Sequence, residues 1–261
     1  LPADEFPSMS GEDMSCRFVL AAADAKSMID RTRFAISNEE TRYYLNGIYL
    51  HATSSSDVPV MRAVATDGHR LARVEMPLPD GAADMPAVII PRKAINEIRK
   101  LSDDTDGEIS VSLSESKLCF AFGDTVLTTK LIDGTFPDYE RVIPAGNDKT
   151  LQVNCKTFAD AVDRVATIST EKSRSVKLQL SDGTLVLSAS SPESGTAREE
   201  LEVSYGSGAM EIGFNSRYLL DIANQIEGEG AVFSLADAAS PTIVRDQDDE
   251  SSLYVLMPMR V

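Results

Sequence analysis

The chain has 261 residues, 43% of them hydrophobic, and a formal net charge of −16. This length allows two ordinary domains with cores of their own, and the composition is typical of a globular protein. No run of about 18 apolar residues predicts a membrane-spanning helix. The acidic balance argues against a nucleic-acid-binding protein, because phosphate binding normally uses a basic surface.

The first six residues (Leu-Pro-Ala-Asp-Glu-Phe) have neither the basic start nor the apolar centre of a signal peptide, so we interpret them as a linker within a longer protein. Cys16, Cys119 and Cys155 are odd in number, form no CxxC pair and have no histidine at metal-ligand spacing. Reduced thiols in a cytoplasmic protein are therefore expected, with no metal or other cofactor.

The first predicted element is an amphipathic helix. Its apolar face is formed by Ala21, Ala25, Met28, Ile29, Thr32 and Ile36. Residues 42–45 (Arg-Tyr-Tyr-Leu) then have the composition of a strand, and residues 60–65 and 71–76 predict two more strands joined at Asp67-Gly68. Residues 87–90 predict a short apolar strand before a second helix, in which Pro91 suits the first turn. That helix has an apolar side made of Ala94, Ile95, Ile98 and Leu101.

The second half repeats this order. The segment 36–42 (Ile-Ser-Asn-Glu-Glu-Thr-Arg) returns 132 residues later, from position 36 to position 168, as Ile-Ser-Thr-Glu-Lys-Ser-Arg. A helix capped by Asn154 precedes it, with Phe158, Ala161, Val162 and Val165 on one face. Strands at 175–180 and 210–214, a turn at Asp182-Gly183 and a helix capped by Ser216 complete the pattern.

Each half thus predicts helix, strands, helix, strands, which indicates two tandem α+β units of one fold. Residues 144–148 are rich in turn-forming residues and lack periodicity, so they are the predicted linker. We expect one domain at 1–147 and another at 148–261.

Only two histidines, His51 and His69, are present, and no catalytic or nucleotide-binding motif occurs. Asp67 and His69 suggest a carboxylate and histidine that act together as a general base for hydrolysis. A tight turn between strands explains them better, because no motif in the sequence indicates a nucleophile. Residues 246–250 resemble half a calcium loop without its glycine, and an acidic surface loop between two edge strands is the favoured interpretation.

Several longer motifs resemble those of the bacterial DNA polymerase III β sliding clamp family. They lie at 42–47 (Arg-Tyr-Tyr-Leu-Asn-Gly), 65–72 (Ala-Thr-Asp-Gly-His-Arg-Leu-Ala), 90–93, 133–139, 213–215 and 254–261. They occur in order along the whole chain. The resemblance implies the middle and C-terminal domains of a clamp, each with two helices on the channel side backed by antiparallel β-sheets, and a non-catalytic processivity role.

In the family, two three-domain subunits close head-to-tail into a ring around duplex DNA. The resemblance implies that the first domain is absent here, so that this chain alone is monomeric. A clamp holds DNA by topology, which reconciles the acidic chain with a DNA role if its channel helices carry excess cations. The second predicted helix has four cations (Arg92, Lys93, Arg99 and Lys100) and one carboxylate, Glu97. The first has three cations (Lys26, Arg31 and Arg33) and two carboxylates (Asp24 and Asp30).

The resemblance also implies a hydrophobic pocket between the two domains that binds short linear motifs of the polymerase catalytic subunit, the clamp loader, translesion polymerases and mismatch-repair proteins. By motif position, its residues are Tyr44, Leu45, Thr66, Gly68, His69, Arg70, Leu71, Pro137, Arg141, Val142, Asn215, Tyr218, Pro241, Val255, Leu256, Met257, Pro258, Met259 and Arg260. Apolar walls with adaptable methionines suit a site that serves many ligands.

Family position also implies channel residues that contact DNA without sequence preference, namely Asn38, Arg42, Tyr43, Arg92 and Lys93. Thr167 and Ile168 take the place of the apolar ring-interface residues. Two positions depart from the family pattern. Pro241 replaces a small polar residue at the pocket rim, and Thr167 is less apolar than the family residue, which leaves the strength of the interface open.

Two other functions stay open on the sequence alone. The acidic isoelectric point of about 4.5 favours an adaptor without a DNA role. The Asp67 and His69 pair favours a small-molecule enzyme. Comparing retention on circular and on linear DNA distinguishes the adaptor from a clamp. Loss of a turnover activity in His69→Ala would support the enzyme.

Overall fold

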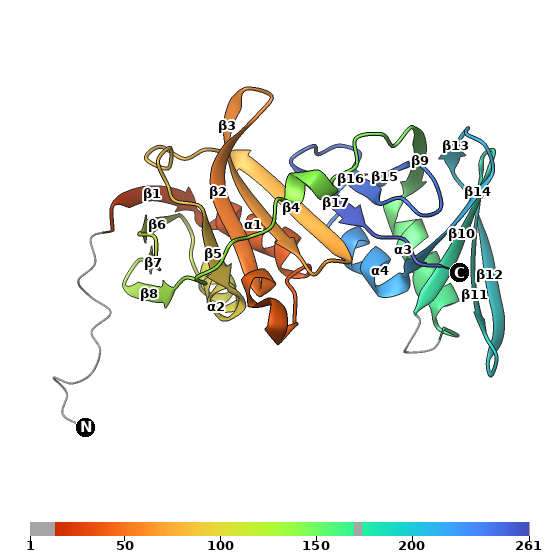
Figure 1. The fold of residues 1–261 in the computed structure, drawn as a ribbon, viewed down its shortest axis with the longest axis horizontal. Helices are drawn as coiled ribbons and strands as arrows, with labels where there is room; N and C mark the ends of the chain where they lie inside the picture. The colour runs from red at the N-terminus through yellow and green to blue at the C-terminus, as the bar shows by residue number, and fades with distance from the viewer. Residues whose placement is uncertain (1–13, 170–173, 261) are drawn as a thin grey trace. The chain divides into compact units, whose positions relative to one another are not determined.

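The computed structural model describes residues 14–169 and 174–260, and the chain forms two compact units (Figure 1). The first unit is built from the residues up to Asp67 and from Arg73–Phe136. The second is built from Gly68–Ala72 and from the residues from Pro137 onward. The domain boundary expected at 147/148 stays a prediction. Within the described ranges, no helix is long and apolar enough to cross a membrane.

The first unit contains two α-helices set among antiparallel strands. Its elements are β1 (Cys16–Ala21), α1 (Ala22–Arg33), η2 (Glu40–Leu45), β2 (Gly47–Ser55), β3 (Val58–Thr66), β4 (Arg70–Pro77), β5 (Val88–Pro91), α2 (Arg92–Asp103), β6 (Glu108–Leu113), β7 (Lys117–Phe122) and β8 (Thr125–Lys130). One sheet has the order β1-β6-β7-β8, and another group has the order β4-β3-β2-β5. The first three residues of β4 belong to the second unit.

The second unit likewise contains two α-helices set among antiparallel strands. Its elements are η3 (Tyr139–Val142), β9 (Lys149–Asn154), α3 (Cys155–Ala166), β10 (Ser175–Ser181), β11 (Thr184–Ser191), β12 (Gly195–Glu202), β13 (Ser204–Tyr205), β14 (Met210–Asn215), α4 (Ser216–Ala223), β15 (Gly230–Leu235), β16 (Thr242–Asp246) and β17 (Ser252–Leu256). Its sheets have the orders β12-β11-β10-β14 and β13-β9-β15-β16-β17. The prediction of two tandem α+β units is confirmed.

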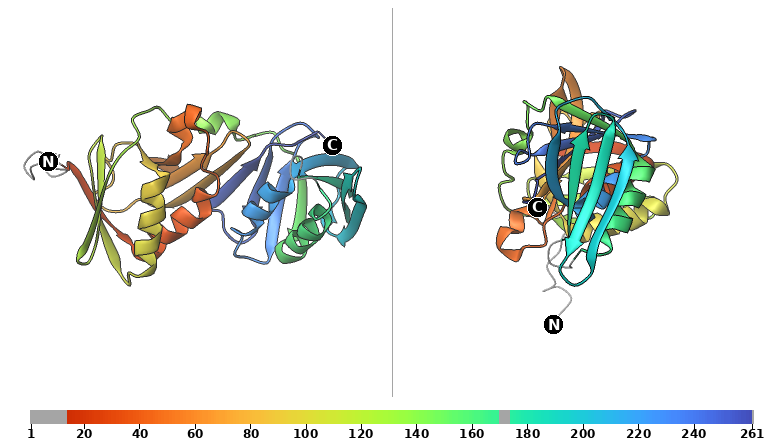
Figure 2. Two further views of the ribbon diagram at one scale, coloured as in Figure 1. Left: turned by 90° about the horizontal axis from the view of Figure 1, so that it is seen from below. Right: turned by 90° about the vertical axis from the view of Figure 1, so that its right-hand side faces the viewer.

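In each unit the two helices lie side by side (Figure 2). The apolar faces of α1 and α2 point into the first unit, where their side chains and those of the strands line one small cavity of about 40 Å³. Met28 and Ile29 of α1 meet Ile95 and Ile98 of α2 there. The predicted periodicity of the helices is therefore confirmed, except that Ala21 ends β1 and Ile36 follows α1.

The helix starts show where local signals sufficed. Asn154 caps α3 as predicted, because its side chain accepts a hydrogen bond from Thr157 N–H at 3.0 Å. The predicted cap of α4 was wrong by one residue, since Asn215 accepts from Arg217 N–H at 3.0 Å and Ser216 is the first helical residue. Pro91 likewise stands just before α2, with extended backbone, rather than in its first turn.

Two other expectations need correction. Residues 42–45 are not a strand but the end of η2, and the next strand begins at Gly47. The acidic segment 246–250 does connect two strands, but β16 lies between β15 and β17 and is not an edge strand. Residues 170–173 of the second repeat copy lie outside the described residues.

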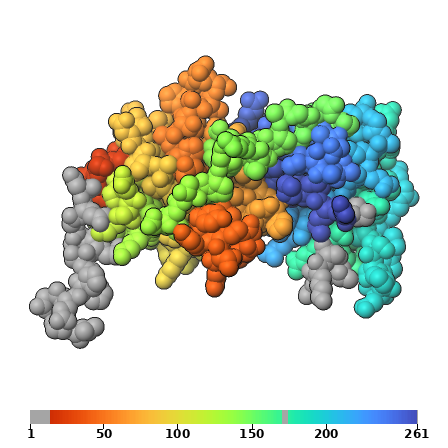
Figure 3. Space-filling view, in the orientation of Figure 1, coloured from red at the N-terminus to blue at the C-terminus, as the bar shows by residue number. Residues whose placement is uncertain are grey.

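A hydrogen bond and a ring contact hold the segment after β8 on the first unit. The segment after β8 crosses the surface of the first unit (Figure 3), where Ile132 N–H donates to Ile89 O at 3.0 Å. Phe136 stacks on Tyr49 with ring centroids 4.8 Å apart.

Burial raises the pKa of the Cys16 and Cys155 thiols, each with a smaller contribution from a nearby carboxylate, so both are poor nucleophiles.

Candidate functional site

On the second unit, a group of aromatic and charged side chains surrounds the start of β4. The Arg70 side chain is 8% exposed and forms an ion pair with Asp221 of α4 at 2.5 Å. Its guanidinium carbon lies 4.3 Å from the centre of the Tyr218 ring, and that ring stacks on His69 at 6.4 Å. Because a buried guanidinium is stable only with such partners, Arg70 fixes the positions of α4 and of the preceding His69.

The residues after β17 continue along this surface. Met257 N–H donates to His69 O at 2.9 Å, and Met259 N–H donates to Gly213 O at 2.8 Å. Met257 is 40% exposed, while the preceding Val255 and Leu256 are buried. Residues 257–260, called the tail below, thus lie on the surface of the second unit and are held by main-chain hydrogen bonds. The side chain of Met257 is open to solvent. Val261 lies outside the described residues.

The short helix η3 adds a second exposed apolar side chain to this unit. Val142 is 52% exposed, whereas Tyr139 one turn earlier is buried. Arg141 is exposed and pairs with Asp138 at 2.7 Å. At the rim position, the Pro241 carbonyl accepts a hydrogen bond from the Asn147 side chain at 3.0 Å, so this segment is anchored through its main chain.

The remaining pocket residues are distributed in three ways. Gly68 is exposed with φ of +89°, and Leu71 is buried in the same segment. Tyr44, Leu45 and Thr66 belong to the first unit, where Leu45 is buried and its carbonyl accepts from Ser37 N–H. The other second-unit members, whose side chains are exposed or half-buried, are Pro137, Asn215, Pro258 and Arg260.

In the first unit, the predicted DNA-contacting residues gather around η2 and the start of α2. Tyr43 is 53% exposed and meets Tyr44 edge to face, with ring centroids 5.8 Å apart. Arg42 donates to both carboxylate oxygens of Glu39, and this hydrogen bonding raises the pKa of Arg42. Arg92 donates to Asn38 Oδ1 and to Ser37 O. Four of the five predicted residues therefore lie in or against one loop.

A hollow of about 540 Å³ lies beside this loop. It is lined by Asn38, Tyr43, Asn46, Pro91, Arg92, Lys93, Asn96 and Ile132. Its walls combine an aromatic ring, amides and cations, which are the groups that bind nucleic acid without sequence preference.

The cations of α1 and α2 are mostly paired with carboxylates. Arg99 pairs with Asp30 at 2.6 Å and also with Asp103, and Lys26 reaches the same Asp103 at 2.5 Å. The hydrogen bond from Lys26 is the largest cause that lowers the pKa of Asp103. The expectation that four cations of the second helix oppose Glu97 alone was wrong, because α2 extends to Asp103 and includes a second carboxylate.

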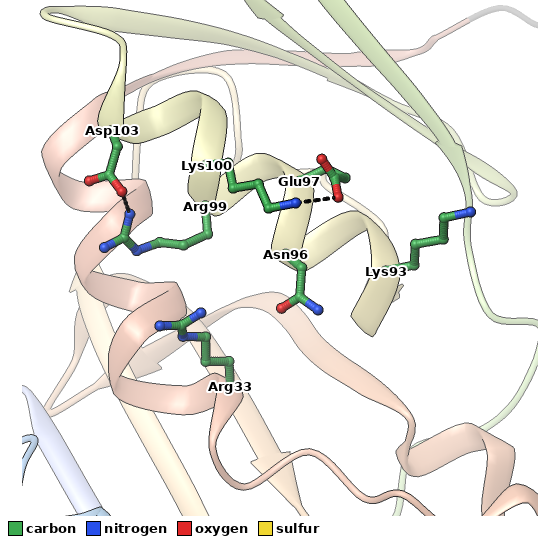
Figure 4. A pocket seen from close by; sticks show the side chains of 7 residues that line it. All are labelled: Arg33, Lys93, Asn96, Glu97, Arg99, Lys100 and Asp103. Atoms are coloured by element: carbon green, nitrogen blue, oxygen red, sulfur yellow. Dashed lines mark hydrogen bonds and ion pairs between the residues drawn. The ribbon is translucent and has the colours of Figure 1, made fainter.

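Figure 4 shows the consequence for the helix surface. Arg99 and Lys100 point toward Asp103 and Glu97, whereas Lys93 extends away from the start of α2. Within residues 14–169 and 174–260, the Lys93 ammonium makes no ion pair or hydrogen bond. The positive field of α2 is thus weak along most of the helix and is concentrated at its N-terminal end.

Thr167 and Ile168, the predicted ring-interface residues, directly follow α3. Thr167 caps the C-terminus of the helix, is exposed and donates its hydroxyl to Asp163 O at 3.1 Å. Ile168 is half-buried.

Two functional contacts escaped the sequence analysis. Asp221, the partner of Arg70, lies 151 residues away in sequence, and its only local signal is the i,i+4 spacing from Arg217. The pairing of Glu39 with Arg42 has i,i+3 spacing, which could have indicated a helical turn at this place instead of a strand.

Comparison with known proteins assigns both units. Residues 20–138 match the family model of the DNA polymerase III beta subunit, central domain, and residues 140–260 match the C-terminal domain of the same subunit. The beta sliding clamp of Caulobacter vibrioides is 52% identical over 261 residues, which are 100% of this chain and 70% of the relative. The chain belongs to the bacterial β sliding clamp family.

Other clamps agree with this assignment. The beta sliding clamp of Escherichia coli K12 is 38% identical over the same 261 residues, again 70% of its length. A sliding clamp structure from Bartonella birtlesii, solved bound to griselimycin, has a TM-score of 0.95 and 52% identity and covers 100% of this chain and 70% of that one. The chain is therefore a DNA sliding clamp polypeptide, a non-catalytic processivity factor of DNA polymerase III. This assignment rules out the hypothesis of an enzyme that uses Asp67 and His69.

Proposed function

We propose that the second unit binds short linear motifs of other proteins on the surface formed by His69, Tyr218, Val142 and Met257. The observation that carries the proposal is that two apolar side chains, Val142 and Met257, are exposed in the same unit as the ion pair of Arg70 with Asp221. A rigid polar frame with adaptable apolar side chains suits a site that accepts several peptides.

Support comes also from a relative, since the similar Bartonella birtlesii clamp was solved with griselimycin bound. We propose that the partners are the polymerase catalytic subunit, the clamp loader, translesion polymerases and mismatch-repair proteins. The first-unit residues Tyr44, Leu45 and Thr66 stay predictions from the family resemblance.

A direct titration tests this proposal. A fluorescein-labelled peptide with a glutamine-and-leucine clamp motif is expected to bind this chain with a dissociation constant on the order of micromolar, as is typical of a small apolar anchor. Fluorescence anisotropy gives the value, and the same peptide with its leucines replaced by alanine is the control. Equal affinity for both peptides would contradict recognition through an apolar surface.

We further propose that the first unit faces duplex DNA through Asn38, Arg42, Tyr43, Arg92 and Lys93. Most cations of α1 and α2 are already paired, so the contacts are weak and sensitive to salt. Such contacts permit sliding when the protein is held on DNA by encirclement. The complete clamp is then a cytoplasmic head-to-tail homodimer with Thr167 and Ile168 in its ring interface, and this chain alone is monomeric.

A further inference from the structure

The loop that carries Tyr43 is closed at its base by main-chain hydrogen bonds. Ser37 N–H donates to Leu45 O at 3.1 Å, and Asn46 N–H donates to Tyr43 O at 3.0 Å. The fold around Tyr43 therefore depends on how residues 37 and 38 at the start of this loop are held.

The exit of the loop is fixed by a close approach of two strands. A Cβ atom at Gly47 would stand 2.2 Å from Ile90 O, so no other residue fits at this position without a shift of β5. Strand β5 ends at Pro91, and Arg92 begins α2, where its N–H donates to Asn46 O at 3.0 Å. The loop exit and the first turn of α2 thus form one rigid corner.

The entrance of the loop is held from the same corner by the Arg92 side chain. One terminal nitrogen donates to Ser37 O, and the other donates to Asn38 Oδ1. Arginine can hold two acceptors at once because its donors form a planar fork, which lysine lacks. Arg92 therefore joins both ends of the loop to α2, one through its main chain and the other through its side chain.

The position of Arg92 makes this contact informative. A cation in the first turn of a helix faces the positive end of the helix dipole, and α2 has no acidic residue in its first turn to offset it. The carbonyl and amide oxygens of the loop supply the missing negative partial charges. Its neighbour Lys93 is exposed and makes no ion pair among the described residues.

We propose that Arg92 is a positioning residue that holds the Tyr43 loop for contact with DNA, and that Lys93 is the cation of this helix end that contacts phosphate. The proposal rests on the DNA interface proposed above. It divides two adjacent cations, which have the same charge and lie in the same turn, into different roles.

The first test needs no DNA. Arg92→Gln, Arg92→Lys and the matched control Lys93→Gln are compared by hydrogen exchange of the loop amides, followed by mass spectrometry of the whole chain. Both Arg92 variants are expected to speed exchange of residues 37–46 about tenfold by releasing the loop entrance. Lys93→Gln is expected to leave this exchange unchanged. Unchanged exchange in both Arg92 variants would overturn the positioning role.

The second test measures binding to a short fluorescent duplex as salt rises. Lys93→Gln is expected to flatten the plot of log affinity against log salt by about 0.9, the contribution of one neutralised phosphate. Arg92→Gln is expected to weaken binding with no change of slope. A slope change in Arg92→Gln equal to that in Lys93→Gln would overturn the division of roles. An unchanged slope in Lys93→Gln would overturn its phosphate contact and the DNA interface, while the exchange test still decides the role of Arg92.

Discussion

Deletion of residues 257–261 is expected to raise the dissociation constant of the clamp-motif peptide at least about tenfold, which corresponds to about 1.4 kcal/mol of binding free energy. The deletion removes the exposed Met257 side chain and both main-chain hydrogen bonds of the tail, to His69 O and to Gly213 O. Buried apolar anchors supply most of the affinity of small interfaces, so their loss has a large effect.

Two further variants separate recognition from folding. Met257→Ala keeps the main-chain hydrogen bonds and removes only the side chain, so it is expected to weaken binding by a smaller factor. Val126→Ala removes an apolar side chain that is more open to solvent, 62% against 40% for Met257, but lies in the first unit, and it is expected to bind as the unchanged chain does. Full affinity after the deletion would show that the peptide binds elsewhere.

Glu75→Gln is expected to destabilise the first unit by about 3 kcal/mol, near the lower end of the cost of breaking a buried ion pair. The side chains of Arg62 and Glu75 are 5% and 10% exposed, and Arg62 Nη2 lies 2.7 Å from Glu75 Oε1. Arg73 lies 3.4 Å from the same oxygen. The neutral amide removes a carboxylate that pairs with both guanidinium groups, although Arg62 and Arg73 keep other contacts.

The matched control is Glu97→Gln, which makes the same chemical change in the same unit. Glu97 pairs with Lys100 on the helix surface, and an exposed pair of this kind contributes about 0–1 kcal/mol. Hydrogen exchange of the β2 and β3 amides measures the stability of the first unit separately from the second. Equal protection in the two variants would contradict the assigned importance of the buried pair.

Short-range patterns in the sequence predicted the regular elements well. The face of α3 and its cap at Asn154 follow from residues within one or two turns of each other, so the local pattern was sufficient. Residues 42–45 show the limit of this approach. Tyrosines and leucine favour a strand by composition, but Glu39 and Arg42 pair one turn apart and Asn46 N–H closes a turn on Tyr43 O, which yields η2.

The candidate site was less accessible to sequence reasoning because its frame is built from distant residues. Arg70 was expected to belong to the peptide pocket, yet its charge is held by Asp221 of α4. Counting charges along α2 likewise missed that Asp103 pairs with Lys26 of α1 as well as with Arg99. Such pairs depend on how helices and strands pack, which no local spacing in the chain records.

Retention on circular DNA tests the central claim most directly. For this experiment, the chain is fused to the C-terminal end of the part of the Caulobacter vibrioides clamp that it does not cover. A bacterial clamp loader then places the fusion protein on a nicked circular DNA. We predict that the protein stays on the circle at high salt and leaves when the circle is cut, because encirclement and not phosphate attraction holds it. Release from circular and linear DNA at the same salt concentration would contradict a clamp.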